Sequence, residues 1–351
     1  MTFRYIGSKA RLADTIVQHL GDRPTGGRFV DAFCGTGAVA ESAAQLGWPI
    51  WANDHLQSAV VVTEARLIAD DQVSFGAHGG YAAAIQSLNS LAPIEGPIWR
   101  EYSPASNNFT ETQRRYFTEG NAGRIDAIRR EIALWQTQRR ITKIESTLLI
   151  ADLLSAMNRV ANIAGTYGCF LSRWQSTALK DISLTPRELK QARSNVITTS
   201  IDVASLAVES NDLVYLDPPY TKRQYASYYH IPETVAIGDE PEVIGVSGLR
   251  PWQSKASVFC YKVKALQALS DLIQNLDAQR ILLSYSAEGH VPIDELHSNL
   301  EAMGDVTTHA LRNVGRYRPN RTASSNSSQV REYLIVVEKE RNQEMLAGNV
   351  A

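Results

Sequence analysis

The sequence predicts an α/β protein with a doubly wound, mostly parallel sheet into which a helical subdomain is inserted. Short apolar runs alternate with stretches of helical pattern, which is typical of parallel strands joined by helices. Between residues 71 and 165 this alternation stops, and a start rich in glycine and proline leads into a long helical pattern. We therefore expect a main domain formed by residues 1–70 and 166–351, and an inserted subdomain formed by residues 71–165.

The strands and helices can be assigned in chain order from their apolar runs and their periodicity. The predicted strands cover residues 28–33, 49–52, 213–216, 280–284 and 332–338. The predicted helices cover residues 38–46, 58–69 and 261–275 and, in the insertion, 124–164. In a sheet of this kind the binding loops lie at the carboxyl ends of the strands, so we look there for residues that carry chemistry.

The composition is that of a globular protein, with 44% hydrophobic and 21% charged residues. No apolar run approaches the roughly 20 residues that a membrane span needs, and the first residues do not have the pattern of a signal peptide. The three cysteines are far apart and fit neither a disulfide framework nor a zinc site. We expect a cytoplasmic protein that has no membrane partner.

Basic residues are concentrated in two stretches, although the net charge is only -2. Eight lysines and arginines lie between Arg114 and Lys143, against three acids, and five arginines and no acid lie between Arg312 and Arg331. Two such stretches on a near-neutral protein are typical of a nucleic-acid-binding surface. Solvated helix and loop faces would account for either stretch taken alone.

A glycine-rich segment follows the first predicted strand and opens the first predicted helix. It contains Asp31, Phe33, Gly35 and Gly37. Its glycines let the backbone approach a ligand, and a helix amino terminus favours an anionic group. Asp54 ends the second predicted strand, where a carboxylate can bind both hydroxyls of a ribose. A nicotinamide-dependent enzyme would have the same spacing, and so would a tight turn without a ligand.

The tetrapeptide Asp217-Pro218-Pro219-Tyr220 comes directly after the apolar strand 213–216. Two prolines cannot continue a central strand, so they end it in a rigid loop. This loop would hold a carboxylate and a phenol ring at the edge of the sheet. An arylamine nitrogen attacks a methyl group only when its lone pair is localised, and hydrogen bonds from its N–H groups to Asp217 and the Pro218 carbonyl would localise it. Tyr220 would stack on the base.

The order of these segments resembles that of the Dam-type DNA adenine methyltransferases, the D12 class, in the alpha-like motif order. The class has a Rossmann-like methyltransferase sheet, and its target-recognition subdomain lies between the cofactor loop and the catalytic tetrapeptide, where the insertion 71–165 lies. The matching segments are Tyr5-Ile-Gly7-Ser-Lys9, the loop from Asp31 to Gly37, Asn53-Asp54, the tetrapeptide, residues 282–286 and residues 331–335.

The resemblance implies S-adenosylmethionine as the cofactor. Lys9 and the adjoining backbone would flank its methionine end, Asp54 would bind its ribose and Asp202 would touch its adenine amine. An acid such as Asp202 after a short strand is also a common helix cap. The implied cofactor-binding residues are Tyr5, Gly7, Lys9, Asp31, Phe33, Gly35, Gly37, Asp54 and Asp202.

The resemblance also implies a duplex DNA substrate, with an adenine flipped out of the helix and methylated directly on N6 without a metal. The implied catalytic residues are Asp217, Pro218, Pro219 and Tyr220. We expect Arg114 and Arg115 in the insertion to read base edges and the arginine-rich loop near the carboxyl end to contact phosphates. The predicted DNA-binding residues are Arg114, Arg115, Lys222, Arg223, Tyr225, Arg316, Arg318 and Arg321.

The predicted function is therefore site-specific adenine-N6 methylation of DNA, as part of a restriction–modification system or as an orphan or phage enzyme. A cognate endonuclease would act in the same system without a stable complex. Three alternatives remain open at this point. A cytosine-N4 or RNA adenine methyltransferase would use the same tetrapeptide, and a catalytically silent DNA-binding protein would share the fold. A nicotinamide dehydrogenase would leave the tetrapeptide without a role.

Overall fold

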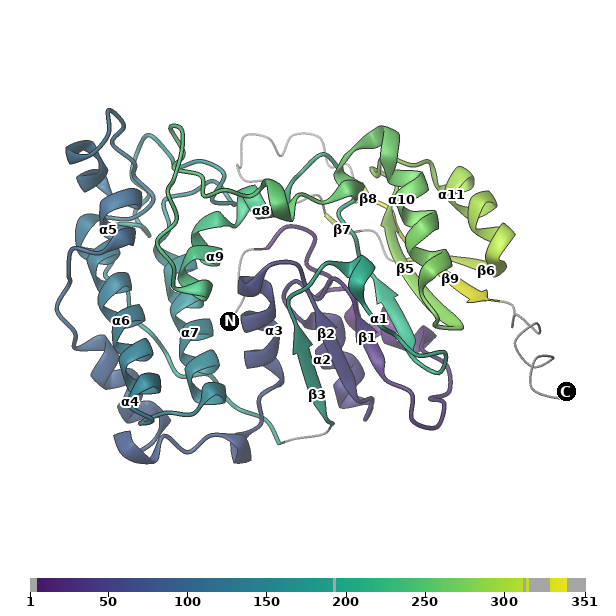
Figure 1. Ribbon diagram of the computed structural model, residues 1–351, viewed down its shortest axis with the longest axis horizontal. Coiled ribbons are helices and arrows are strands. Elements are labelled where there is room, and N and C mark those ends of the chain that lie inside the picture. The colour runs from purple at the N-terminus through teal and green to yellow at the C-terminus, as the bar shows by residue number, and fades with distance from the viewer. Residues whose placement is uncertain (1–4, 192–193, 312–313, 316–328, 340–351) are drawn as a thin grey trace, which may run out of the picture.

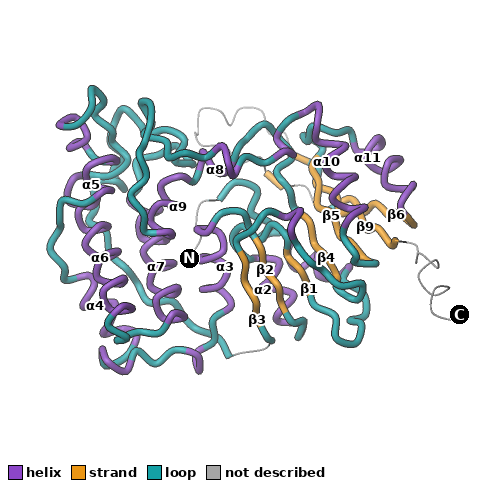
Figure 2. Tube along the Cα trace, in the orientation of Figure 1, coloured by secondary structure: helices purple, strands orange, loops and turns teal. Residues whose placement is uncertain are grey.

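The computed structural model describes residues 5–191, 194–311, 314–315 and 329–339. Two parts lie side by side, a twisted sheet covered by helices and a group of roughly parallel helices (Figures 1 and 2). Among the helices described, none is long and apolar enough to cross a membrane.

In the part of the chain that the structure describes, the main sheet has seven strands in the order β3-β2-β1-β4-β5-β9-β6. Its strands are β1 (Phe29–Asp31), β2 (Ile50–Asn53), β3 (Val196–Thr199), β4 (Leu213–Leu216), β5 (Arg280–Ser286), β6 (Gly304–Ala310) and β9 (Glu332–Lys339). The strands from β3 to β5 pair in parallel, and β9 is antiparallel to both of its neighbours. The two-residue strands β7 (Val314–Gly315) and β8 (Gln329–Val330) form a separate antiparallel pair. The prediction of a mostly parallel sheet is confirmed.

Side chains of β4 alternate between the two faces of the sheet, as the period of two in a strand requires. Leu213 and Tyr215 pack in a core with the helices α1 (Ala13–Ile16) and α2 (Ala38–Gln45). Val214 and Leu216 pack on the opposite face in a core with α10 (Lys262–Asn275) and α11 (Ile293–Leu300). Helices therefore cover both faces of the sheet, which confirms the doubly wound architecture.

The helical part is built on α3, which follows β2 in the chain. Its helices are α3 (Gln57–Leu67), α4 (Tyr81–Asn89), α5 (Pro97–Tyr102), α6 (Glu119–Thr137), α7 (Lys143–Val160) and α9 (His230–Ile237), with the short α8 (Tyr225–Tyr228) leading into α9. One hydrophobic core joins the inserted helices to α3 and α9. The boundaries 71 and 165 remain a prediction, because this core extends across both of them.

Two predictions of secondary structure differ from the structure. Residues 124–164 contain two helices, because Arg139 adopts a left-handed conformation with a φ of 58° and Thr142 begins α7 in a capping box with Glu145. Strands β3 and β6 were not among the predicted strands, because both are half-exposed and form the two edges of the sheet.

The chain order reverses between β1 and its neighbour β4, since β2 and β3 extend the sheet on one side and β5 extends it on the other. Such a switch point leaves a crevice outside the carboxyl ends of the two strands. Asp31 ends β1 and Asp217 follows β4, so both carboxylates lie at this crevice.

Candidate active site

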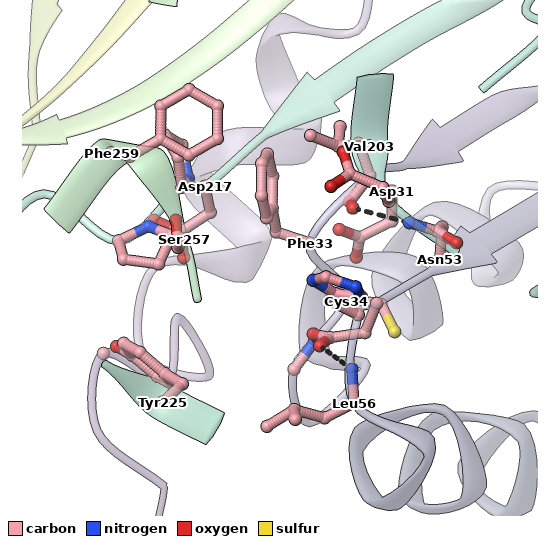
Figure 3. A pocket seen from close by; sticks show the side chains of 18 of the residues that line it. Asp31, Phe33, Cys34, Asn53, Leu56, Val203, Asp217, Tyr225, Ser257 and Phe259 are labelled. Atoms are coloured by element: carbon pink, nitrogen blue, oxygen red, sulfur yellow. Dashed lines mark hydrogen bonds between the residues drawn. The ribbon is translucent and has the colours of Figure 1, made fainter. Parts of the chain in front are cut away.

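A cavity of about 450 Å³ lies at the carboxyl ends of β1, β2 and β4. Figure 3 shows it from close by, with side chains that follow β1 and β2 and side chains from residues 203–259 around one space. Of the residues predicted to form the site, it is lined by Tyr5, Gly7, Lys9, Asp31, Phe33, Gly35, Asp54, Asp202, Asp217, Pro218, Pro219, Tyr220 and Tyr225. Its volume is in the range of sites that bind small molecules.

Gly37, in contrast, lies outside the cavity lining and begins α2 with a φ of 70°. A Cβ atom at this position would lie 3.0 Å from the Cα of Thr63 in α3. Glycine is therefore needed here for the conformation and for the close approach of two helices. Gly37 thus has a packing role, and its role in cofactor binding stays a prediction.

The Asp54 carboxylate holds the glycine-rich loop in place by hydrogen bonds to backbone N–H groups. Its Oδ2 accepts a hydrogen bond from the backbone N–H of Gly35 at 3.0 Å, and its Oδ1 accepts one from the N–H of Leu56 at 3.0 Å. The side chain is buried, and burial raises the pKa of Asp54 to about 6. Each carboxylate oxygen keeps a lone pair, so Asp54 can also accept hydrogen bonds from a ligand in the cavity.

The Asn53 side chain connects the ends of neighbouring strands by hydrogen bonds on one side of the cavity. Its amide nitrogen donates to the carbonyls of Ala32 at 3.3 Å and Ile201 at 3.1 Å. Its Oδ1 accepts from the Thr199 hydroxyl at 2.8 Å and the Ile201 N–H at 3.2 Å. The segments after β1, β2 and β3 are held together by one buried side chain. Asp202 follows Ile201 in the chain and caps a short helical turn, because its side chain accepts a hydrogen bond from the N–H of Ala204 at 2.9 Å.

One wall of the cavity is aromatic and also contains a buried carboxylate. Phe33 and Phe259 contact edge to face, with ring centroids 5.8 Å apart and an interplanar angle of 81° (Figure 3). The Oδ1 atom of Asp31 is buried and has no hydrogen-bond partner among the described residues. Burial raises the pKa of Asp31 well above its usual value, with Asp217 and Asp54 adding to the effect. A buried acceptor without a partner indicates a ligand that supplies a donor.

The tetrapeptide loop places Asp217 next to Lys9. The Nζ atom of Lys9 is 3.1 Å from Asp217 Oδ1 and 3.1 Å from Glu332 Oε2, and it lies 5.2 Å from the centroid of the Tyr220 ring. Lys9 was predicted to flank the methionine end of a cofactor, whereas in the structure its ammonium bridges two carboxylates. The backbone carbonyl of Tyr220 accepts from the N–H of His290 at 2.9 Å, which fixes the end of the loop.

These contacts set the charge of the loop. Burial raises the pKa of Asp217 to about 6, against the lowering effect of the Lys9 ammonium. Burial also opposes the charged form of Lys9, but Asp217, then Tyr220 and then Glu332 hold its pKa well above the usual value. Lys9 is therefore charged over the physiological range, and Asp217 ionises within reach of neutral pH.

Tyr225 of α8 and Tyr229, which lies between α8 and α9, hold the segment that carries Lys9. Tyr5 stacks on Tyr229 with ring centroids 4.5 Å apart and an interplanar angle of 19°. The N–H of Ile6 donates to the Tyr229 hydroxyl at 2.7 Å, and the Tyr225 hydroxyl donates to the Ile6 carbonyl at 3.0 Å. Tyr225, which was predicted to contact DNA, therefore lies in the cavity wall and positions the segment before β1.

Comparison with known proteins shows the family to which the chain belongs. The family of D12 class N6 adenine-specific DNA methyltransferases matches residues 5–298. The chain belongs to this family. It is 31% identical to the Type II methyltransferase M.FokI of Planomicrobium okeanokoites over 96% of this chain and 53% of that protein. It is 33% identical to the modification methylase LlaI of Lactococcus lactis subsp. lactis over 84% of this chain and 47% of that protein.

The Type II methyltransferase M.NlaIII of Neisseria lactamica is 31% identical over 95% of this chain and 99% of that protein. The chain thus spans about half the length of the first two relatives and nearly the whole of the third. The resemblance to the D12 class is confirmed, and methyltransferases of this class generally use S-adenosylmethionine.

Within this member of the D12 family, Arg114 does not lie where it could read bases, contrary to the prediction. Its side chain is buried, and its guanidinium donates to the Glu101 carboxylate at 3.0 Å and to the carbonyls of Gly245 at 3.1 Å and Val246 at 3.2 Å. Because these partners occupy the guanidinium and cover it, Arg114 stabilises the loop after α9 and is not available to DNA.

The other predicted DNA contacts have different surroundings. Arg115 is half-buried and donates to the Ser172 carbonyl at 2.7 Å and to the Gln113 side chain. Lys222 and Arg223 are exposed directly after the tetrapeptide. All three remain predicted DNA contacts. Arg316, Arg318 and Arg321 lie outside the described residues.

The sequence did not indicate three further polar residues at the site. Glu233 in α9 accepts from the N–H groups of Gln57 at 3.0 Å and Ser58 at 2.8 Å at the start of α3. Lys255 lines the cavity and pairs with Glu233 at 2.8 Å. No local pattern links residues so far apart. Glu332 lay within a segment recognised as a strand, and an acid at the start of a buried strand was the available signal.

Proposed function

We propose that this chain transfers a methyl group from S-adenosylmethionine to the N6 atom of an adenine that is flipped out of duplex DNA at a specific sequence. The observation that carries the proposal is the position of Asp217, which lies in a rigid Pro-Pro loop at a cavity and, among the described residues, pairs ionically with Lys9. The names of the relatives, Type II methyltransferase and modification methylase, support DNA modification as the role.

The donor set of the cavity fits S-adenosylmethionine. This molecule combines a cationic amino-acid end, a ribose diol and a flat adenine ring. Asp54 offers carboxylate lone pairs for the diol, and the unpaired Oδ1 of Asp31 offers an acceptor for an N–H or O–H donor. Phe33 and Phe259 offer apolar ring surface for the adenine. When bound, the cofactor supplies an electrophilic methyl group.

Asp217 acts on the nucleophile. The lone pair of the adenine amine is delocalised into the ring, so the amine is a poor nucleophile in water. A hydrogen bond from its N–H to the Asp217 carboxylate, and a second to the Pro218 carbonyl, would localise the lone pair and hold the amine in line with the methyl group. Tyr220 would stack on the base and keep it in the cavity. Flipping the base out costs roughly a few kcal/mol, which contacts with the pocket offset.

The DNA surface would include groups on both sides of the cavity. Lys222 and Arg223 follow the catalytic loop and are exposed, so they are suited to phosphate contacts near the flipped nucleotide. We assign recognition of the target sequence to the inserted helices of residues 71–165, with Arg115 as one contact. In a cell the protein would work in the cytoplasm, either beside an endonuclease of the same specificity without a stable complex, or as an orphan or phage enzyme.

Mapping of the methyl group tests the proposal. The protein is incubated with labelled S-adenosylmethionine and a pool of duplexes, and the product is digested to nucleosides and also mapped by position. The expected product is N6-methyladenine at one position of a short shared sequence. N4-methylcytosine, methylation of RNA in preference to DNA, or no transfer to any duplex would overturn it.

A further inference from the structure

Glu332 is a buried carboxylate at the candidate active site that has no role in the mechanism above. Lys9 Nζ lies 3.1 Å from Glu332 Oε2 and 3.1 Å from Asp217 Oδ1, and the side chains of Lys9, Asp217 and Glu332 are 5%, 15% and 7% exposed. Glu332 begins β9, where it pairs in register with Ser286 of β5, and its carbonyl accepts from the N–H of Leu311 at 2.8 Å. Its position is therefore fixed by the sheet.

The three side chains differ from a simple ion pair in their total charge. Lys9 with Asp217 alone would form a neutral pair, in which the ammonium cancels most of the potential of the carboxylate and competes for its lone pairs. With Glu332 ionised, the group has a net charge of minus one. The ammonium divides its three N–H donors between two acids, and Asp217 retains acceptor strength towards the cavity.

We propose that Glu332 is a positioning residue for methyl transfer, which draws the Lys9 ammonium away from Asp217 and so makes the ionised Asp217 carboxylate a stronger hydrogen-bond acceptor for the adenine amine. This inference rests on the proposed function.

The charge movement of the reaction explains why a net negative group matters. The bond between sulfur and the methyl carbon breaks as the bond between N6 and that carbon forms, so the positive charge of the sulfonium moves to N6. The extra proton then leaves N6 for solvent or a nearby acceptor. A group with a net charge of minus one beside N6 stabilises the developing positive charge, whereas a neutral pair does so much less.

The other titratable groups around Asp217 do not supply a second negative charge as Glu332 does. Asp31 of β1 and the tyrosines Tyr215, Tyr220 and Tyr225 also face it. Burial raises the pKa of each of these groups. The phenols are therefore neutral near neutral pH, and burial also disfavours the ionised form of Asp31. Within the described part of the chain, Lys9 and Glu332 are the charges that act most on Asp217.

The sign of the expected pH effect follows from these charges. Burial raises the pKa of Asp217 to about 6, Lys9 lowers it and Glu332 raises it. Removing the negative charge of Glu332 should therefore lower the pKa of Asp217. An anionic Asp217 is needed for transfer, so the acid limb of the rate against pH should move to lower pH, while the maximal rate should fall because Lys9 now neutralises Asp217.

The first test is kinetic and uses Glu332→Gln in the full chain. We expect kcat to fall on the order of tenfold and the acid limb to move down by about one pH unit. Glu332→Asp retains the charge at a greater distance from Lys9, and should give a smaller displacement in the same direction. The matched control is Glu338→Gln, on the same strand, because Glu338 pairs with Arg280 at the opposite end of β9. In this control variant, the acid limb of the rate against pH should not move.

The second test does not require turnover. The carboxyl carbon of Asp217 is followed by ¹³C NMR as a function of pH, with Asp217→Asn used to assign its signal, in the wild type and both Glu332 variants. The titration should move to lower pH in both variants, by more in Gln than in Asp.

The inference would be overturned if the Asp217 titration stayed at the same pH in the variants that fold. It would also be overturned if kcat fell and the acid limb of the rate against pH did not move. If Glu332→Gln fails to fold, Glu332→Asp decides the outcome. A wild type that methylates no DNA would instead overturn the proposed function, and the titration would still test the arrangement of charge.

Discussion

Two buried aspartates in different parts of the molecule have the same raised pKa and very different surroundings. Burial raises the pKa of Asp217, at the cavity, to about 6, and it raises that of Asp126, in α6 of the helical part, to about 6 as well. Asp126 accepts from the backbone N–H groups of Ile98 at 3.0 Å and Trp99 at 2.8 Å and so caps the start of α5. Asp217 instead faces open volume and has one lysine as its partner.

The same contrast extends to other buried charges. In the helical part, Glu145 accepts from the N–H groups of Ser74 at 2.9 Å and Thr142 at 2.8 Å, and Arg114 is occupied by carbonyls and a carboxylate. At the cavity, Asp31 retains an unpaired oxygen. A shifted pKa alone therefore does not identify a catalytic group. A buried charge whose hydrogen-bonding capacity is filled stabilises the fold, and one that is unfilled beside a cavity is available for chemistry.

The largest expected difference is between the alanine variants of Asp217 and Asp126, in kcat and in the free energy of unfolding. Asp217→Ala should lower kcat at least a hundredfold, because the amine loses the acceptor that localises its lone pair. Asp126→Ala should leave kcat within about twofold but reduce the free energy of unfolding by about 1–3 kcal/mol, since two N–H groups lose their acceptor. Rates with labelled cofactor and urea unfolding measure the two effects. Comparable losses of kcat in both variants would remove the distinction.

A smaller effect should separate two carboxylates of the cofactor site. Asp54→Ala should weaken binding of S-adenosylmethionine about tenfold or more, because Asp54 is buried, fixes the Gly35 loop and faces the cavity. Asp202→Ala should weaken it only severalfold, since Asp202 is exposed and already caps a helical turn. Calorimetry on the free protein measures both affinities. Unchanged affinity in Asp54→Ala would place the ribose elsewhere in the cavity.

The smallest functional effect should distinguish neighbouring arginines. Arg115→Ala should weaken binding to the cognate duplex by about 1–3 kcal/mol and less on other duplexes, with an unchanged midpoint of thermal unfolding. Arg114→Ala should lower that midpoint, because Glu101 loses its buried partner, and should leave the affinity of the folded protein for DNA unchanged. Fluorescence anisotropy and a melting curve decide between the two. A sequence-selective loss of affinity in Arg114→Ala would restore it as a base-reading residue.

The sequence predicted those parts of the fold and the site that depend on local pattern. Strand β4 and the tetrapeptide that ends it were recognised together, because an apolar run followed by two prolines leaves few alternatives. The glycine-rich loop and Asp54 were found in the same way. Helix α7 could have been separated from α6 by its capping box, Thr142 with Glu145, which is visible in the sequence.

The remaining features depend on contacts between distant segments. The pairing of Lys9 with Glu332 joins residues 323 positions apart, and that of Glu233 with Lys255 depends on how α9 packs beside α3. Arg114 was misassigned because the density of basic residues along a stretch does not show which side chain points inward. Such features follow from packing, which a single sequence does not display.

The place of β9 has a consequence for how the protein is made. This strand is inserted between β5 and β6, both of which precede it in the chain, and it brings the second carboxylate to a lysine at position 9. At 5–20 residues per second, a ribosome delivers residue 332 roughly 15 to 65 s after residue 9. A nascent chain whose first six sheet strands have emerged still lacks this carboxylate. Under the proposed function, translation products that end before β9 lack Glu332, and we expect them to be poor methyltransferases.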